Sequence, residues 1–205
     1  MNIASSQDVD RAVIADRAST IRRALNGRSI VLVGIMGVGK STIGKRLSQY
    51  LDIPFTDADK EIEKAAGMAI DDIFDQFGEA AFRAGEKKVI KRLMGESQSI
   101  LATGGGAFMN EEIRDDIREG GVSVWLNADI DILMKRVQRR AGRPLLQEDD
   151  PEAVMRKLLE ERNPIYGLAD IHIESRTVSR DVIAGELVDL LAQKLPDIAQ
   201  ERGWT

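Results

Sequence analysis

The chain has 205 residues, of which 43% are hydrophobic and 31% are charged, and its formal net charge is -5 at pH 7. These values are typical of one folded domain with a buried core, and the negative charge argues against general binding to nucleic acid or a membrane surface. The chain has no cysteine, no secretion signal within residues 1–10 and no apolar run near the roughly 20 residues of a membrane span, so we expect a cytoplasmic protein without disulfides.

The first predicted element is an amphipathic helix from Asp8 to Leu25. Apolar residues recur there at helical spacing, as at Ala18 and Ile21. We treat residues 1–28 as a helical extension of the domain. Three roles stay open for it: packing on the domain, lying free in solvent, or serving self-association or regulation.

Residues 34–42 spell a phosphate-binding loop, Gly-Ile-Met-Gly-Val-Gly-Lys-Ser-Thr. An apolar run at 29–33 predicts a buried strand before it, and residues 42–51 predict a helix after it, which is the context that this motif requires. Glycines in such a loop let backbone N–H groups converge on phosphate oxygens. The predicted nucleotide-binding residues here are Gly37, Val38, Gly39, Lys40, Ser41 and Thr42. The motif predicts that the chain binds a nucleoside triphosphate, with Ser41 offering an oxygen to Mg²⁺.

The elements that follow alternate between strands and helices. Further strands are predicted at 53–56, 99–102, 122–126 and 171–173. Helices are predicted at 60–66, 70–77, 79–94, 110–119, 130–140, 151–165 and 180–195, with breaks at Gly67 and Gly78. This alternation predicts a three-layer α/β/α fold with a five-stranded parallel sheet over residues 29–195. Residues 196–205, with an isolated Trp204, are expected to form a flexible tail.

Three predicted strands end in segments suited to a ligand: the phosphate loop, the pair Asp57 and Asp59, and the triple glycine at 104–106. Ligands of parallel sheets bind beyond the carboxyl ends of the strands, so these segments are expected to share one edge. Asp57 is suited to the hydration shell of Mg²⁺, and Asp59 to orienting or deprotonating an acceptor hydroxyl. Either aspartate could instead be a turn residue or a helix cap, and the glycines could be only a loop.

Basic residues gather between Lys135 and Arg143, where five occur without a carboxylate. Most of them fit a solvated helix face. Arg143 differs because it lies in Gly-Arg-Pro-Leu-Leu at 142–146, which predicts a loop. We expect residues 140–150 to form a lid that brings Arg143 over the triphosphate, where it stabilises charge as the phosphoryl group moves.

Taken together, these segments resemble the shikimate kinase family from about Ile30 to Ile173. The matching segments are the phosphate loop, Asp57-Ala58-Asp59, Phe82-Arg83, Gly104-Gly105-Gly106, Arg143-Pro144-Leu145-Leu146 and Arg162-Asn163-Pro164-Ile165-Tyr166. Many families share the phosphate loop, but its combination with the aspartate pair, the triple glycine and the separated arginines is specific. The resemblance implies ATP-dependent phosphorylation of the 3-hydroxyl of shikimate, a small cyclic carboxylate, in aromatic amino-acid biosynthesis.

On the substrate side, the resemblance implies that Asp59 binds shikimate hydroxyls and accepts the proton of the 3-hydroxyl. Arg83 and Arg162 match arginines that bind the carboxylate, which suits their guanidinium forks. Gly104, Gly105 and Gly106 are predicted to bind the substrate, and Gly105 and Gly106 match backbone donors to it.

On the nucleotide side, the resemblance implies that Lys40 and the lid residue Arg143 act on the triphosphate during catalysis. Ser41 and Asp57 match the Mg²⁺ environment. Arg136 matches an arginine that lies against adenine, although its basic neighbours leave that register open. The implied partners are ATP and shikimate alone, bound by a monomer.

The phosphate loop is also compatible with two other functions. Another small-molecule or nucleoside monophosphate kinase would share the phosphate loop and an arginine lid. A nucleotide-dependent switch of the GTPase type should carry an Asn-Lys-x-Asp motif, which this chain lacks.

Tyr166 and His172 are predicted to be packing residues outside the site.

Overall fold

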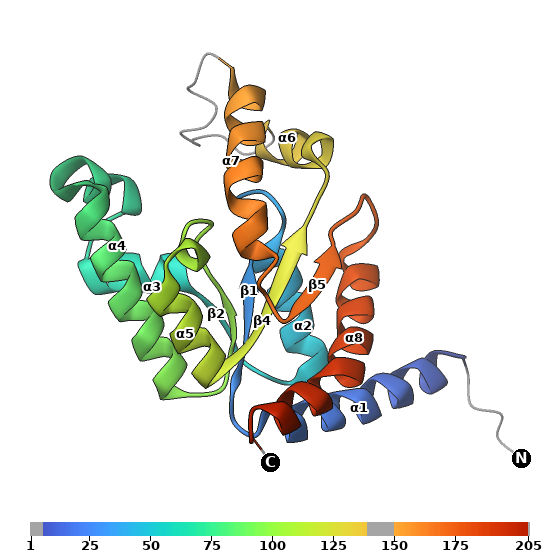
Figure 1. The fold of residues 1–205 in the computed structure, drawn as a ribbon. Coiled ribbons are helices and arrows are strands. Elements are labelled where there is room, and N and C mark those ends of the chain that lie inside the picture. Colours follow the sequence, from blue (N-terminus) through green and yellow to red (C-terminus); the bar gives the residue numbers. More distant parts are fainter. Residues whose placement is uncertain (1–5, 139–149, 205) are drawn as a thin grey trace, which may run out of the picture.

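A computed structural model describes residues 6–138 and 150–204 of the chain. Its centre is a sheet of five strands in the order β2-β3-β1-β4-β5, and all neighbouring strands pair in parallel (Figure 1). The strands are β1 (Ser29–Val33), β2 (Phe55–Asp57), β3 (Ile100–Ala102), β4 (Gly121–Asn127) and β5 (Ile171–Glu174). Every residue of the central strand β1 is buried, as expected for a strand covered on both faces.

Helices cover both faces of this sheet, with α4 and α5 on one side and α2 and α8 on the other (Figure 1). The helices are α1 (Ser6–Leu25), α2 (Lys40–Leu51), α3 (Ala58–Ala66), α4 (Ile70–Glu96), the 3-10 turn η1 (Ala107–Met109), α5 (Glu111–Gly120), α6 (Ile130–Gln138), α7 (Pro151–Tyr166) and α8 (Arg180–Glu201). The predicted three-layer fold and its five parallel strands are therefore confirmed. None of the described helices is long and apolar enough to cross a membrane.

The sheet register brings three strand ends to one edge. Leu32 of β1 and Asp57 of β2 both pair with Ala102 of β3. The next residues along each strand are those of the phosphate loop, the aspartate pair and the triple glycine. The expected meeting of these segments follows directly from this register.

Gly78 interrupts α4 as the sequence predicted. Its backbone angles, φ 77° and ψ 172°, are not helical, so the two arms of α4 meet at a kink. These angles lie in a region that is open almost only to glycine. The arm after the kink carries Arg83.

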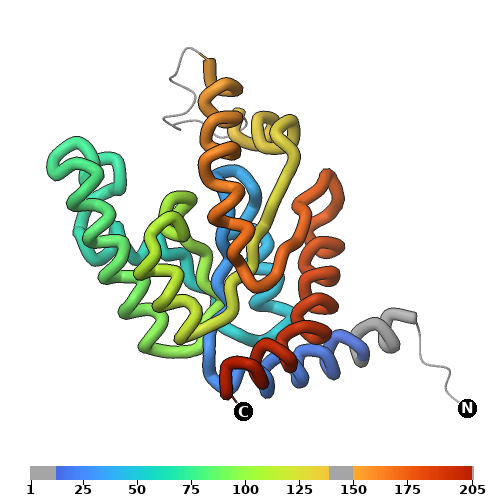
Figure 2. Tube along the Cα trace, viewed as in Figure 1, coloured from blue at the N-terminus to red at the C-terminus, as the bar shows by residue number. Residues whose placement is uncertain are grey.

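The N-terminal helix α1 packs on the domain, which was one of its three predicted roles. Ala18, Ile21 and Leu25 are buried, and α1 contacts α2 and α8. In Figure 2 the blue N-terminal helix and the red C-terminal helix run side by side, away from the ligand edge of the sheet.

The prediction of a flexible tail after Leu195 is wrong. Helix α8 continues through Pro196 to Glu201, because the apolar spacing that buries Leu195 also buries Ala199. Trp204 then folds back and is only 4% exposed, with the guanidiniums of Arg28 and Arg202 over its ring. Burial of these apolar surfaces outweighs the backbone hydrogen bond that the proline cannot donate.

The predicted lid at 140–150, with Arg143, lies outside the described residues except for Asp150. Asp150 is the N-cap of α7, and its side chain accepts a hydrogen bond from the Ala153 N–H at 3.0 Å. Pro151 follows in the first turn of α7, where the missing N–H of proline costs nothing.

Candidate active site

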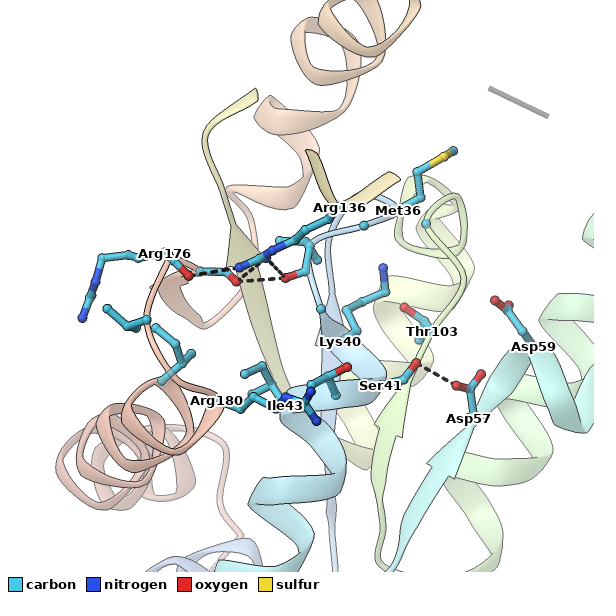
Figure 3. Close-up of a pocket in the computed structure, with 18 of the residues that line it drawn as sticks. Met36, Lys40, Ser41, Ile43, Asp57, Asp59, Thr103, Arg136, Arg176 and Arg180 are labelled. Carbon is cyan, nitrogen blue, oxygen red and sulfur yellow. Dashed lines mark hydrogen bonds between the residues drawn. The ribbon is translucent and has the colours of Figure 1, made fainter. Parts of the chain in front are cut away.

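A cleft of about 730 Å³ opens at the carboxyl edge of the sheet (Figure 3). The phosphate loop, the aspartate pair, Thr103, Gly105 and Arg136 line it, together with the loop that joins β5 to α8. The predicted nucleotide residues that the structure describes therefore border the same space as Asp59 of the predicted acceptor site.

The phosphate loop leaves β1 in a conformation that depends on glycine. Gly34, Gly37 and Gly39 have positive φ values of 134°, 83° and 108°. A Cβ atom at Gly34 would lie 2.4 Å from the carbonyl oxygen of Leu126, so no other residue fits there. Helix α2 starts at Lys40 directly after the loop, which directs its first N–H groups towards the cleft.

The side chain of Lys40 folds back onto the first residues of this loop. Its Nζ donates hydrogen bonds to the carbonyl oxygens of Gly34 at 2.5 Å and Ile35 at 3.1 Å. The ammonium group is thereby held against the start of the phosphate loop. This arrangement is suited to the β- and γ-phosphates of a nucleoside triphosphate.

Ser41 and Asp57 meet at the floor of the cleft, where the Ser41 hydroxyl donates to Asp57 Oδ2 at 2.8 Å (Figure 3). Both offer hard oxygen ligands next to the phosphate loop. Among the described residues there is no cluster of three or more side chains able to hold a metal ion. The oxygen pair of Ser41 and Asp57 suits Mg²⁺, which keeps several waters and takes other ligands from phosphate oxygens.

Asp59 lies in the first turn of α3 with its carboxylate against the triple glycine. A Cβ atom at Gly104 would be 2.9 Å from Asp59 Oδ1. Burial, followed by the negative charge of Asp57, raises the pKa of Asp59 to about 6, and Lys40 opposes this shift. A carboxylate with this pKa can accept a proton near neutral pH, as a general base requires.

The two predicted carboxylate ligands reach the same glycine loop from different helices. Arg83 of α4 lies so close to Gly106 that a Cβ atom there would be 2.5 Å from its Nη2. Arg162 of α7 donates from Nη1 to the carbonyl oxygen of Gly105 at 3.5 Å. Two guanidiniums at one loop make this corner suited to a small carboxylate.

Glu86 was missed by the sequence analysis. It is 1% exposed, and its Oε2 accepts a 2.7 Å hydrogen bond from Arg83 Nη1. Its other oxygen has no hydrogen-bond partner among the described residues and faces Gly104. Burial raises the pKa of Glu86, and Arg83 opposes that shift. The available signal was a carboxylate on the apolar face of α4, one turn after Arg83.

Arg136 lines the cleft beside the phosphate loop. Its guanidinium donates to the carbonyl oxygens of Val38 and Arg176 at 2.9 and 3.0 Å, and to the hydroxyl of Ser175 at 2.9 Å (Figure 3). Burial lowers its pKa. Arg136 thus joins the phosphate loop to the loop after β5, and sequence reasoning did not find Ser175.

The chain is similar in sequence and in structure to proteins of one known family. The family model described as shikimate kinase matches residues 36–192. A shikimate kinase of Bradyrhizobium diazoefficiens is 53% identical over 188 residues, covering 92% of this chain and 91% of that protein. One of Brucella canis is 49% identical over 179 residues, covering 87% and 90%.

A solved structure of shikimate kinase from Acinetobacter baumannii in complex with shikimate is also similar. It superposes with a TM-score of 0.78 at 35% identity, covering 83% of this chain and 96% of that one. The family match extends over most of the chain and includes the phosphate loop from Met36, the aspartate pair and both carboxylate-binding candidates. The chain belongs to the shikimate kinase family.

Proposed function

We propose that this protein transfers the γ-phosphoryl group of ATP to the 3-hydroxyl of shikimate, giving shikimate 3-phosphate and ADP. One observation carries the proposal: the triple glycine adjoins Asp59 at Gly104, Arg162 at Gly105 and Arg83 at Gly106. An acid and two guanidiniums around bare backbone N–H groups match the hydroxyls and the carboxylate of a small cyclic acid.

In the proposed reaction, Arg83 and Arg162 bind the substrate carboxylate and orient the ring. Asp59 accepts the proton of the 3-hydroxyl while the hydroxyl oxygen attacks the γ-phosphorus. The bond from the γ-phosphorus to the oxygen shared with the β-phosphate breaks, and ADP leaves. Lys40 and the N–H groups of the phosphate loop stabilise the charge on the phosphate oxygens. Arg143 is assigned to the same task from the family pattern alone.

Ser41 and Asp57 are the residues that would hold Mg²⁺, Asp57 through water. When bound, the ion neutralises charge on the phosphate oxygens. Arg136 is assigned to the adenine end. We further propose that one chain carries the complete site, that the enzyme acts as a monomer in the cytoplasm, and that ATP and shikimate are its only partners.

The test is ADP release with Mg²⁺ and ATP, measured with and without shikimate. We expect release that depends on shikimate, with ³¹P NMR showing the phosphate on the 3-hydroxyl. Gluconate and nucleoside monophosphates serve as competing acceptors. ADP release that does not depend on shikimate, or that is faster with one of these other acceptors, would overturn the proposal.

A further inference from the structure

Tyr166, the last residue of α7, contacts the triple glycine at 104–106, called the acceptor loop below, although Tyr166 itself lies outside the cleft. Its side chain is 1% exposed, and its hydroxyl donates a hydrogen bond to the carbonyl oxygen of Gly105. The ring stacks with Phe108 of η1 and with Trp125 of β4, with centroid distances of 6.4 and 6.1 Å. Because the ring is buried and packed against two aromatic neighbours, the hydroxyl is held in one direction.

Gly105 is also where the acceptor loop approaches the phosphate loop. A Cβ atom on Gly105 would lie 3.3 Å from the Met36 backbone nitrogen and 3.8 Å from the Gly34 carbonyl oxygen. Arg162, one helical turn before Tyr166, reaches the same carbonyl as the tyrosine. One peptide group therefore connects the phosphate loop, the acceptor loop and α7.

The orientation of this peptide decides where its N–H points. The bond between Gly105 and Gly106 is trans, so the Gly105 carbonyl and the Gly106 N–H point in opposite directions. Within the described residues, the Gly106 N–H has no hydrogen-bond partner, and Arg83 lies directly beside Gly106. A hydrogen bond that fixes the carbonyl therefore also aims the free N–H.

We infer that Tyr166 is a positioning residue for phosphoryl transfer, which fixes the Gly105–Gly106 peptide so that the acceptor loop and the phosphate loop keep their spacing. The inference rests on the proposed function, because the N–H that it aims is a proposed donor to shikimate. Tyr166 itself does not touch the substrate. Its contribution should appear in the use of shikimate and not in the binding of ATP.

The state of the phenol adds a feature that can be checked. Burial raises the pKa of Tyr166 to about 12, against the opposing charge of Arg162. The hydroxyl therefore remains a donor throughout any practical assay range. Removing the hydroxyl should therefore lower kcat/KM for shikimate by the same factor at every pH, unlike any effect that depends on Asp59.

The experiment compares Tyr166→Phe with wild type in the full chain, because phenylalanine keeps both ring contacts and removes only the hydroxyl. We expect kcat/KM for shikimate to fall about tenfold at every pH, which corresponds to about 1.4 kcal/mol. The KM for ATP and the slow ATP hydrolysis without shikimate should change less than about twofold. Tyr50→Phe, at the other of the two tyrosines, is the matched control and should behave as wild type.

The outcomes separate this inference from the proposed function. Wild-type protein that does not phosphorylate shikimate overturns both. Active wild type with an unimpaired Tyr166→Phe overturns the inference alone, as does a rise in the KM for ATP equal to the rise in the KM for shikimate. If Tyr166→Phe does not fold, Phe108→Leu loosens the stack and keeps the hydroxyl. Phe108→Leu should lower kcat/KM for shikimate by less than about tenfold and leave the KM for ATP unchanged. An unchanged kcat/KM for shikimate would count against the inference.

Discussion

Asp59 is held where its charged form is disfavoured, which is unusual for a surface cleft and useful for a base. Burial and the neighbouring charge of Asp57 raise its pKa to about 6. Asparagine is nearly isosteric with aspartate and would remove this poorly solvated charge, so Asp59→Asn should not lower stability. Chemistry and stability therefore place opposite demands on position 59.

Replacing Asp59 with asparagine should nearly abolish shikimate phosphorylation. A general base of this kind contributes about a hundredfold to ten-thousandfold to turnover, and we expect kcat to fall within that range. ATP affinity, measured by titration calorimetry, should stay close to the wild-type value because the phosphate loop is untouched. A variant that retains more than about a tenth of wild-type kcat would exclude Asp59 as the base.

The pH profile gives a second measurement of the same group. Asp59 must be ionised to accept a proton, so kcat/KM for shikimate should rise with pH and level off above a pKa of about 6. Below that value it should fall about tenfold per pH unit. A profile that shows an inflection only near pH 4, the ordinary range of a solvated aspartate, would contradict the burial argument.

Arg83 allows a test of geometry at constant charge. Arg83→Lys keeps a cation but cannot form a two-pronged contact with a carboxylate, so we expect KM for shikimate to rise about tenfold or more. The matched control is Arg92→Lys on the same helix, where the arginine pairs with Glu61 and Glu96. An unchanged KM in Arg83→Lys would remove Arg83 from the carboxylate site.

At this scale, the sequence reveals residues that belong to a spaced motif, and it conceals those that act through packing. Lys40 and Asp59 could be predicted because each follows a strand end in a pattern with few structural uses. Glu86 and Tyr166 could not, because one occupies an apolar helix face and the other is a buried aromatic. Only the fold shows that their polar atoms reach Arg83 and Gly105.

Among the elements, α4 depends on the special conformation of one glycine. Gly78→Ala would force a Cβ atom into the φ 77°, ψ 172° region, so we expect it to lower the free energy of unfolding by about 1–3 kcal/mol. Gly85→Ala on the same helix is the counterpart, because its Cβ atom would meet nothing within 4 Å. That change should raise the free energy by about 0.5–1 kcal/mol. Urea unfolding of both variants distinguishes them, and equal stabilities would show that the kink is not required.

The order and type of the elements were predictable because hydrophobic periodicity and glycine breaks agree along the chain. The exception is the end of α8, which continues through Pro196 where a flexible tail is predicted. Tertiary contacts outweigh the low helix propensity of proline at this point, because Leu195 and Ala199 are buried on either side of Pro196. Trp204 is buried as well, just after the helix ends. Local rules cannot foresee a partner such as Arg28, which lies far away in the sequence.

On the scale of the whole molecule, the N-terminal and C-terminal helices pack against each other far from the cleft. Helices α1 and α8 pack together, and the Asn26 side chain donates to the Trp204 carbonyl oxygen at 2.6 Å. The cleft lies beyond the carboxyl ends of the strands, whereas α1 lies at the other end of the sheet (Figure 1). Stability and catalysis should therefore respond to different substitutions.

Ile21→Ala tests this separation. Ile21 is 0% exposed, so truncation should cost about 2–5 kcal/mol, which lowers Tm by roughly 4–20 °C in a chain of this size. At a temperature where both proteins are folded, kcat and both KM values should match wild type. Val13→Ala on the same helix, where valine is 42% exposed, should change neither property. If Ile21→Ala leaves Tm unchanged, α1 is not part of the cooperative unit. If it slows turnover of the folded protein, the ends of the chain are coupled to the cleft, and the two properties are not separable.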